Sequence, residues 1–339
     1  MSKLMRAAVF YGADGFKLED HPIPVPSAGQ ILYKVRATTI CGADINTYNR
    51  WKGGAVLQKG MIFGHEVAGE IVEDSTGVFK TGDVAAISPN KGCGYCWFCR
   101  HELPNVCEKR DTHTTSTGGG YAEYGLAYPD QIYIPEKQLL PEELALSEPL
   151  ACCIHSYKLT SYKPGDKVLI IGAGGCAQFF IQLAKIYGAL SVTVADSIKT
   201  RLDLAIKMGA DRVINTNNEE IDTHDSDTEG YDLVIITRSS PEFFEKAFSY
   251  SNWFGRVLIY GVAKPGIFSK YEPYLLHKKQ LSLHISRSFG GNSYETAVNF
   301  LASGRISAKG LVTRIIGIDD IPTAIENNNG QIKTAIKPC

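Results

Sequence analysis

A glycine-rich turn between a short apolar run and an amphipathic segment constrains the fold of this chain most strongly. The turn is Gly172-Ala-Gly-Gly-Cys-Ala177, and the apolar run Lys167–Ile171 comes directly before it. A strand, a glycine turn and a helix in this order place a dinucleotide pyrophosphate on the N-terminus of the helix. Gly172 permits the tight turn, Gly174 lets the backbone approach the phosphates, and Ala177 takes the third position of the pattern. The turn, Gly175 included, therefore predicts a cofactor site.

An acidic residue strengthens this prediction. Asp196 ends the next apolar run, Ser191–Ala195. This is about the spacing expected of the acid that binds the adenosine ribose hydroxyls. A carboxylate there also repels a 2′-phosphate, so the sequence favours NAD over NADP as the cofactor.

The pattern of the chain changes at about residue 164. From there strand-like runs alternate with helical patterns, which predicts an α/β unit with a parallel, doubly wound sheet of the Rossmann type. The residues before it carry strand patterns such as Arg6–Phe10 and Ile31–Ala37, so we expect a β-rich domain. The last fifty residues, with a helix near Tyr294–Ala302, are expected to return to that domain. The predicted domains are residues 1–150 with 290–339, and residues 151–289.

The composition excludes several classes of protein. The chain has 339 residues, of which 44% are hydrophobic, and a formal net charge of −1. This balance gives no electrostatic attraction to nucleic acid or to a membrane surface. No apolar run has the length of a membrane span, and the N-terminus lacks a signal-peptide pattern. We therefore expect a cytoplasmic protein with no nucleic-acid or membrane partner.

Four of the nine cysteines crowd into one short segment, at Cys93, Cys96, Cys99 and Cys107. In a reducing compartment such a cluster indicates metal ligation rather than disulfides. Zn²⁺ takes four thiolates in a tetrahedral shell that leaves no position for a substrate, so we predict a structural zinc site. An iron–sulfur cluster uses the same donors and is an open alternative. A zinc ribbon that binds nucleic acid is disfavoured, because acidic residues intersperse the basic residues nearby.

Other candidate metal donors are dispersed along the chain. Cys41 follows a strand pattern, His65 and Glu66 follow a glycine, and Glu148 lies shortly before the change of pattern. Taken singly, each has an ordinary structural explanation, since a lone cysteine is usually a small core residue.

Several motifs in a fixed order carry a resemblance that covers nearly the whole chain. The sequence resembles the zinc-dependent medium-chain dehydrogenases/reductases, in particular their sorbitol (polyol) and threonine dehydrogenase branch. The matching stretches are Cys41-Gly42-x-Asp44, Gly64-His65-Glu66-x-x-Gly69, the four-cysteine segment, Gly119-Gly-Tyr-Ala-Glu-Tyr124, Glu148-Pro-Leu150 and the glycine turn with Asp196. The resemblance implies a GroES-like catalytic domain together with the Rossmann domain.

The resemblance also implies a catalytic zinc held by Cys41, His65 and Glu66. Glu148 would be a further ligand or would hold a zinc-bound water, and a carboxylate at this position is typical of the polyol and threonine branch. A catalytic zinc keeps an open position and polarises the bound oxygen, so the alcohol loses its proton more easily and passes hydride to the nicotinamide. Arg201 falls where related enzymes often carry an arginine along the adenine face.

Some positions depart from the family pattern. Ala43 stands where Ser or Thr is usual, and Asn46 where this branch usually has His; those side chains commonly relay the proton to solvent. We expect the proton to leave instead through Glu148 or Glu66, or through a neighbouring group of the substrate. Glu102 replaces a glycine of the four-cysteine segment, and we expect it to alter the loop without removing the metal.

The substrate end is less clearly marked. Arg287 resembles the arginine that polyol dehydrogenases place over the substrate. Residues 48–51 are candidates for lining the cleft, with packing or a surface loop as the alternative.

The sequence therefore predicts a zinc-dependent, NAD-linked dehydrogenase of secondary alcohols such as polyols, sugars or cyclitols. The nearest alternative is an L-threonine 3-dehydrogenase or amino-alcohol dehydrogenase, and the next is a sugar-alcohol-phosphate dehydrogenase. A catalytically silent binding protein on the same fold is favoured by Ala43 and Asn46 and opposed by the intact donor set. By analogy with relatives we expect a homodimer or homotetramer that acts on a small-molecule alcohol.

Overall fold

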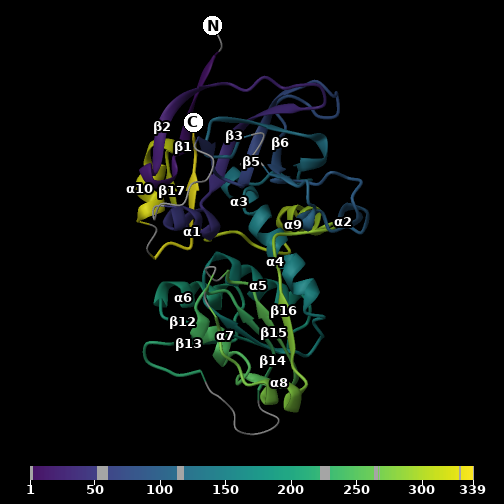
Figure 1. The fold of residues 1–339 in the computed structure, drawn as a ribbon, viewed down its shortest axis with the longest axis vertical. Helices are drawn as coiled ribbons and strands as arrows, with labels where there is room; N and C mark the ends of the chain where they lie inside the picture. The colour runs from purple at the N-terminus through teal and green to yellow at the C-terminus, as the bar shows by residue number, and fades with distance from the viewer. Residues whose placement is uncertain are drawn as a thin grey trace. The chain divides into compact units, whose positions relative to one another are not determined.

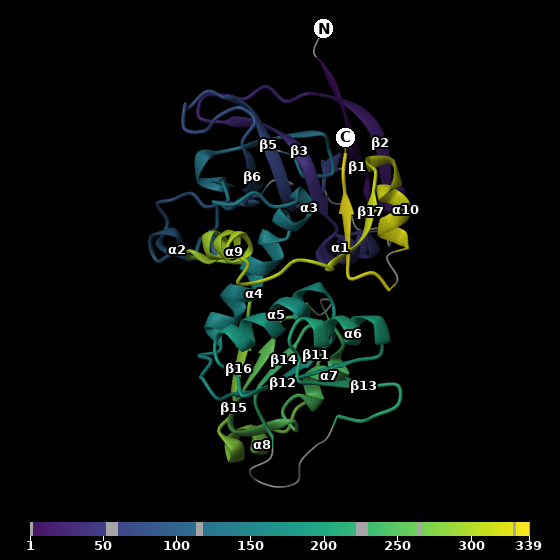
Figure 2. The same cartoon turned by 180° about the vertical axis from the view of Figure 1, so that it is seen from behind.

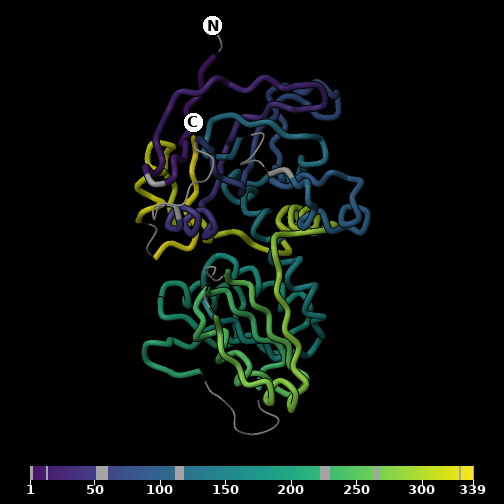
Figure 3. Tube along the Cα trace, viewed as in Figure 1, coloured from purple at the N-terminus to yellow at the C-terminus, as the bar shows by residue number. Residues whose placement is uncertain are grey.

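The structure is a computed structural model that describes residues 3–51, 60–112, 118–221, 230–262, 266, 268–327 and 330–338. The chain divides into two compact units. The first comprises residues 1–151 and 290–339, and the second comprises residues 152–289 (Figures 1 and 3).

The second unit is built on a six-stranded sheet in which every pairing is parallel. Its strand order, β13-β12-β11-β14-β15-β16, is that of a doubly wound dinucleotide-binding sheet. The strands are β11 (Lys167–Ile171), β12 (Ser191–Asp196), β13 (Arg212–Asn215), β14 (Tyr231–Ile236), β15 (Ser251–Ile259) and β16 (Ser282–Ile285). The helices between them are α5 (Gly175–Ile186), α6 (Lys199–Lys207), α7 (Pro241–Lys246) and α8 (Pro273–Lys279) (Figure 2). The predicted fold class of this unit is confirmed.

Burial explains why these runs form strands. Residues 168–171 of β11 and 233–236 of β14 are all buried. A parallel sheet is covered on both faces, so its central strands read as continuous apolar runs rather than alternating ones. The edge strand β16 differs, because three of its four residues are exposed.

The first unit contains a seven-stranded sheet in the order β10-β6-β5-β3-β18-β17, with β9 also paired to β3. These strands are β3 (Ile31–Thr39), β5 (Glu66–Asp74), β6 (Val84–Ile87), β9 (Tyr124–Ala127), β10 (Ile132–Tyr133), β17 (Val312–Ile316) and β18 (Lys333–Ile336). The strands β2 (Phe16–Pro22), β1 (Leu4–Phe10) and β4 (Met61–Ile62) form a second sheet, and β7 (Asn90–Lys91) pairs with β8 (Asp111–Thr112). Two C-terminal strands thus join the sheet of the N-terminal region, with Ala335 opposite Thr39.

The helices of the first unit are α1 (Gly42–Trp51), α2 (Trp97–Arg100), α3 (Pro141–Leu144), α9 (Ser293–Ala302) and α10 (Ile321–Glu326), and α4 spans Ser147–Leu159. None of the helices in the described part of the chain has the length and apolar character needed to cross a membrane.

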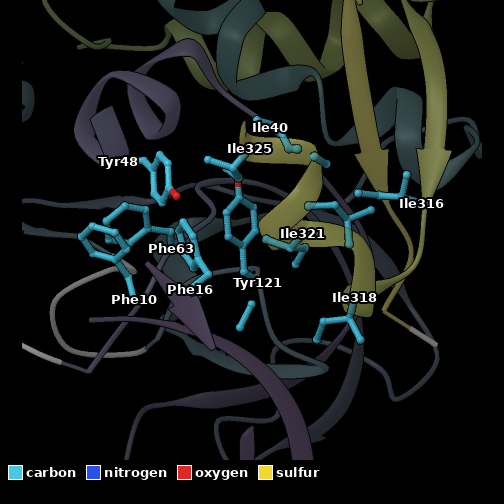
Figure 4. Close-up of a cluster of buried hydrophobic side chains, with 13 residues drawn as sticks. Phe10, Phe16, Ile40, Tyr48, Phe63, Tyr121, Ile316, Ile318, Ile321 and Ile325 are labelled. Atoms are coloured by element: carbon cyan, nitrogen blue, oxygen red, sulfur yellow. The ribbon is translucent and has the colours of Figure 1, made fainter. Parts of the chain in front are cut away.

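An aromatic core lies beside the N-terminal strands of the first unit (Figure 4). The ring centres of Phe10 and Phe63 are 4.8 Å apart, and those of Phe10 and Phe16 are 5.0 Å apart. Tyr121 belongs to this core and has no exposed surface. Large rings packed at these distances resist displacement, so the core fixes the position of Tyr121.

Candidate functional site: two metal-type clusters and a glycine turn

Three dispersed donors meet in the first unit. Cys41 lies between β3 and α1, His65 precedes β5, and Glu66 is the first residue of β5. The β3–β5 register sets Glu66 opposite Thr39, two residues before Cys41. The donor atoms of Cys41, His65 and Glu66 all lie within 4.8 Å of one another. A thiolate, an imidazole and a carboxylate at this spacing are donors that Zn²⁺ accepts, so the donor set fits zinc.

A buried aspartate orients the imidazole of this group. The Nδ1 atom of His65 lies 3.4 Å from Oδ1 of Asp44. The other Asp44 oxygen accepts the Tyr121 hydroxyl at 2.8 Å and the backbone N–H of Cys41 at 3.3 Å. A carboxylate behind one ring nitrogen fixes the tautomer and leaves the other nitrogen, Nε2, for a metal. The sequence does not reveal this role, because Asp44 appears there only as one position of the Cys41-Gly42-x-Asp44 motif.

The glycine before His65 allows Tyr121 to reach Asp44. Gly64 has a φ of 93°, and a Cβ there would lie 2.6 Å from the Tyr121 ring. The N–H groups of Tyr121 and Gly120 donate to the carbonyls of Phe63 and Gly64, both at 2.8 Å. Any side chain at position 64 would therefore separate the two segments that support His65.

A buried lysine contacts the carboxylate of the group. Lys333, the first residue of β18, donates from Nζ to Oε1 of Glu66 at 2.5 Å and to Oε2 at 2.6 Å. Glu66 also accepts a hydrogen bond from the Thr39 hydroxyl. Glu66 has no exposed surface and the side chain of Lys333 is 7% exposed. A buried carboxylate needs such a partner, because removing a charge from water is costly. Sequence reasoning missed Lys333; its one signal is a cation within the short strand pattern of residues 332–336.

The protonation of the donors follows from burial and from their neighbours. Burial raises the pKa of the Cys41 thiol to about 11, and the charge of Glu66 acts in the same direction. Burial alone would lower the pKa of His65, but the negative charge of Asp44, joined by that of Cys41 whenever its thiol is ionised, raises it well above its usual value. Metal binding at this group therefore competes with protons, since thiolate and neutral imidazole are the ligating forms.

Four other residues that the sequence analysis considered take different positions. Glu148 lies in the first turn of α4 and is buried, but it is not one of the side chains that meet within 4.8 Å. Ala43 and Asn46 are exposed on α1. Tyr48 packs in the aromatic core, where its ring is 6.0 Å from that of Phe16, and donates a hydrogen bond to Glu326. The packing alternative therefore holds for Tyr48.

The four cysteines Cys93, Cys96, Cys99 and Cys107 also meet, with all sulfur atoms within 4.8 Å. The sulfurs of Cys93 and Cys99 are 4.0 Å apart, and those of Cys96 and Cys107 are 3.7 Å apart. A zinc tetrahedron with bonds of about 2.3 Å has sulfur–sulfur edges of about 3.8 Å, so the donor set fits zinc. All four are free thiols.

Backbone N–H groups point at these sulfurs. The N–H of Cys96 approaches the sulfur of Cys93 at 3.4 Å, and the N–H of Cys99 approaches that of Cys96 at 3.4 Å. Burial would raise the pKa of the Cys93 thiol, but backbone donors at Tyr95 and Cys96 lower it to about 6. Burial raises the pKa of the neighbouring Cys99 thiol to about 12, so these backbone donors favour the thiolate, which is the metal-binding form, at Cys93 and not at every sulfur of the loop.

Glu102 adopts the backbone conformation that the glycine of the family pattern would favour. Its φ is 60°, in the left-handed region, and its carbonyl accepts the N–H of Gly291 at 2.9 Å. Glu102 therefore occupies a backbone conformation that is strained for residues other than glycine. The four sulfurs still converge.

The glycine turn of the second unit requires glycine at its first position. Gly172 has a φ of 98°, and a Cβ there would lie 2.5 Å from Oγ1 of Thr237. Gly174 is the residue before α5, and a Cβ there would meet no protein atom within 4 Å. Gly175 and Ala177 are buried in the first turn of α5. The turn thus leaves open space at the N-terminus of a helix, where backbone N–H groups bind phosphate.

Asp196 ties the end of β12 to this turn. Its Oδ2 atom accepts the N–H of Ala173 at 2.7 Å, and its Oδ1 atom accepts the N–H of Ile198 at 2.9 Å. A pocket of about 160 Å³ opens beside it. Its lining includes four predicted cofactor residues, Gly172, Gly174, Asp196 and Arg201, and also Ser197, Ile198, Thr237 and Arg238. Arg287, by contrast, is exposed beyond β16.

Comparisons with known proteins agree with this arrangement. Residues 27–138 match the alcohol dehydrogenase GroES-like domain family, and residues 175–303 match the zinc-binding dehydrogenase family. The chain is 32% identical to the sorbitol dehydrogenase of Bacillus subtilis over 330 residues, which cover 95% of this chain and 93% of the relative. It is 30% identical to the L-threonine 3-dehydrogenase of Pyrococcus horikoshii over 334 residues, which cover 96% and 94%.

A solved structure of a Sinorhizobium meliloti protein, described as a zinc-binding dehydrogenase bound to NADP, has the same fold. Its TM-score is 0.92 at 27% identity, with 99% of this chain and 100% of that chain covered. This chain is therefore an oxidoreductase that belongs to the zinc-dependent medium-chain dehydrogenases/reductases, among their zinc-binding, nicotinamide-dependent alcohol dehydrogenases.

Proposed function

We propose that this enzyme transfers hydride between a secondary alcohol and NAD, giving a ketone, and that the alcohol is a polyol, a sugar or a cyclitol. The observation that carries the proposal is the convergence of Cys41, His65 and Glu66, with Asp44 behind the imidazole. The relatives named sorbitol dehydrogenase and D-arabinitol dehydrogenase support a polyol substrate. Zinc held by the three donors would polarise the alcohol oxygen and favour loss of its proton.

Other residues of the chain would orient the metal ligands and remove the proton of the alcohol. Asp44 holds His65 in one orientation, and Lys333 holds Glu66 in the buried interior. Because both Glu66 oxygens accept from the Lys333 ammonium, we assign removal of the proton to Glu148 rather than to Glu66. Glu148 would act as a further ligand or through a water. A Glu148→Gln variant whose turnover rate and pH dependence equal those of the wild type would contradict this assignment.

Asp196 supports NAD as the cofactor. Each carboxylate oxygen has a second lone pair beyond the backbone contact, so Asp196 can still accept the ribose hydroxyls. We further propose that Cys93, Cys96, Cys99 and Cys107 hold a second, structural zinc. A reducing compartment such as the cytoplasm suits the eight cysteines of the described residues, none of which is in a disulfide.

The exposed edge of the second unit supports a homo-oligomer. Strand β16 is at the end of the sheet, and its Leu283 and Ile285 side chains are 45% and 68% exposed. An edge strand with exposed apolar side chains is a surface that a second copy can cover by strand pairing. We propose a homodimer, or a homotetramer built from such dimers.

The L-threonine 3-dehydrogenase relatives favour a second candidate, the oxidation of an amino alcohol. A panel of polyols, sugars, cyclitols, L-threonine and sugar-alcohol phosphates, assayed for NADH and NADPH formation, separates these substrates. Turnover of a polyol or cyclitol with NAD is the expected result. Turnover of L-threonine alone would establish the second candidate, and zinc-loaded protein without turnover on any substrate would indicate a binding protein.

A further inference from the structure

The pocket beside the glycine turn has a second cationic side chain that sequence reasoning did not single out. Arg238 lies two residues beyond the end of β14 and contributes to the lining together with Asp196 and Arg201. Arg201 is half-buried on α6, whereas Arg238 is exposed.

Local packing places Arg238 against the turn. The hydroxyl of Thr237 donates to the carbonyls of Ile171 at 3.0 Å and of Gly172 at 3.3 Å, which fixes the chain after β14 onto the turn. Arg238 follows at once, and its Cγ lies 2.8 Å from the point where a Gly172 side chain would begin. The guanidinium carbon is 5.3 Å from the ring centre of Phe243 on α7. The stem is thus packed and the head rests over a ring, so the side chain is partly preorganised.

The charges of the lining do not balance. Asp196 is the one carboxylate among the eight lining residues, and Arg201 and Arg238 are two guanidinium groups. The Asp196 carboxylate is further compensated by two backbone N–H donors, from Ala173 at 2.7 Å and from Ile198 at 2.9 Å. A 2′-phosphate on the ribose would therefore meet two cations and one hydrogen-bonded anion. Guanidinium groups bind phosphate oxygens in bidentate geometry and remain charged at every working pH.

We propose that Arg238 determines cofactor specificity by binding the 2′-phosphate of NADP(H), so that the enzyme accepts both nicotinamide cofactors and Asp196 sets only a moderate preference for NAD. The inference rests on the proposed cofactor site, but not on the identity of the alcohol or on the metal. It predicts an affinity difference between two ligands that share every group except the 2′-phosphate.

Direct binding titrations of NADH and NADPH, followed by nicotinamide fluorescence in the full-length protein, test this inference. The wild type should bind both. Arg238→Gln should weaken NADPH about tenfold or more and NADH less than about threefold, because a charge-assisted pair to one phosphate is lost. Arg238→Lys should keep most of the NADPH affinity. The matched control is Lys246→Gln, which removes a cation of α7 that pairs with Glu242 outside the pocket lining; it should change neither affinity.

Adenosine 2′-monophosphate and adenosine 5′-monophosphate, used as competitors, isolate the phosphate position. Arg238→Gln should weaken competition by the 2′ isomer alone. Equal weakening of NADH and NADPH, or no change in either, overturns the role of Arg238. Binding of NADH without any binding of NADPH overturns the inference and leaves the proposed function standing. Absence of binding by both cofactors would overturn the proposed cofactor site itself.

Discussion

The four-cysteine segment, called the lobe from here on, and the Cys41 group, which consists of Cys41, His65 and Glu66, both bring metal donors together. They do so in different ways. The lobe takes its sulfurs from a single segment, residues 93–107, and nearby backbone N–H groups orient them. The Cys41 group joins a loop after β3 to the start of β5, and depends on Lys333 at a separation of 267 residues from Glu66. The lobe is thus formed by one local segment, whereas the Cys41 group forms only when distant segments of the first unit pack together.

This difference separates stability from reactivity. Four thiolates complete a tetrahedral shell, so a metal in the lobe can only hold the loop together. The Cys41 group has three donors, keeps Cys41 and His65 partly exposed, and places its charge compensation in the buried interior at Glu66 and Lys333. Loss of a donor in the lobe should therefore affect folding first, and loss of a donor at the Cys41 group should affect turnover first.

The largest effect is expected from the buried ion pair. Lys333→Met leaves the Glu66 carboxylate buried without its cation and should lower the free energy of unfolding by about 3–5 kcal/mol. Urea denaturation measures this change. The double variant Lys333→Met/Glu66→Gln removes both charges and should recover most of the loss. Arg6→Met breaks an exposed pair with Asp319 and should cost less than about 1 kcal/mol. A similar cost for Lys333→Met and Arg6→Met would contradict the assigned importance of the buried pair.

The pH dependence of zinc affinity should show that Cys41 and His65 act together. The pKa of the Cys41 thiol is about 11 and that of His65 is raised well above its usual value, so both carry protons near neutral pH before metal binds. Zinc displaces both protons, and its affinity should rise with pH by up to about 100-fold per unit until His65 deprotonates. Chelator competition between pH 6 and 8, in protein with an intact lobe, measures the slope. A flat profile would show that these two groups are not the ligands.

Loss of the orienting carboxylate should have an intermediate effect. Asp44→Asn keeps the size of the side chain but removes the charge that faces His65, so zinc affinity at this group and turnover should each fall about 10- to 100-fold. Tyr121→Phe, which removes only the hydroxyl bonded to Asp44, should have a smaller effect in the same direction. Metal titration and steady-state kinetics provide the two readouts. Unchanged zinc affinity in Asp44→Asn would rule out this role of Asp44.

The smallest effect is expected in the lobe. Glu102 has a left-handed φ of 60°, so Glu102→Gly relieves strain but adds freedom to the unfolded chain, and should raise the free energy of unfolding by no more than about 1 kcal/mol. Thermal denaturation of the zinc-loaded protein detects the shift, and turnover should not change. A clear loss of stability would mean that the Glu102 side chain supports the lobe by contacts that outweigh the backbone strain.

The sequence predicts those features that depend on local pattern. The alternation of strand-like runs with helical patterns after about residue 164 is sufficient to predict the parallel sheet, and the structure confirms this fold class. The four cysteines converge as their spacing suggests. These features lie within one or two consecutive elements, so period, spacing and turn chemistry are enough.

Features that depend on distant pairing are not visible in the sequence. Lys333 reaches Glu66 because β18 pairs with β3, which in turn pairs with β5. Asp44 gains its role only when the chain at Tyr121 approaches Gly64, and Arg238 enters the cofactor pocket only when β14 lies beside β11. No periodicity in the chain encodes these contacts, since they follow from the order of strands in the completed sheets.

Zinc counting tests the separation of the two centres most directly. Elemental analysis of the purified wild type should find two zinc ions per chain, and His65→Ala and Cys96→Ala should each retain one. His65→Ala should lower the melting temperature less than Cys96→Ala does, while losing about 1000-fold or more in turnover, because a Lewis acid contributes several kcal/mol to lowering the barrier. Cys96→Ala should have a lower melting temperature than the wild type, while its folded fraction should retain turnover. A single zinc in the wild type, or loss of both ions in either variant, would contradict two independent centres with separate roles.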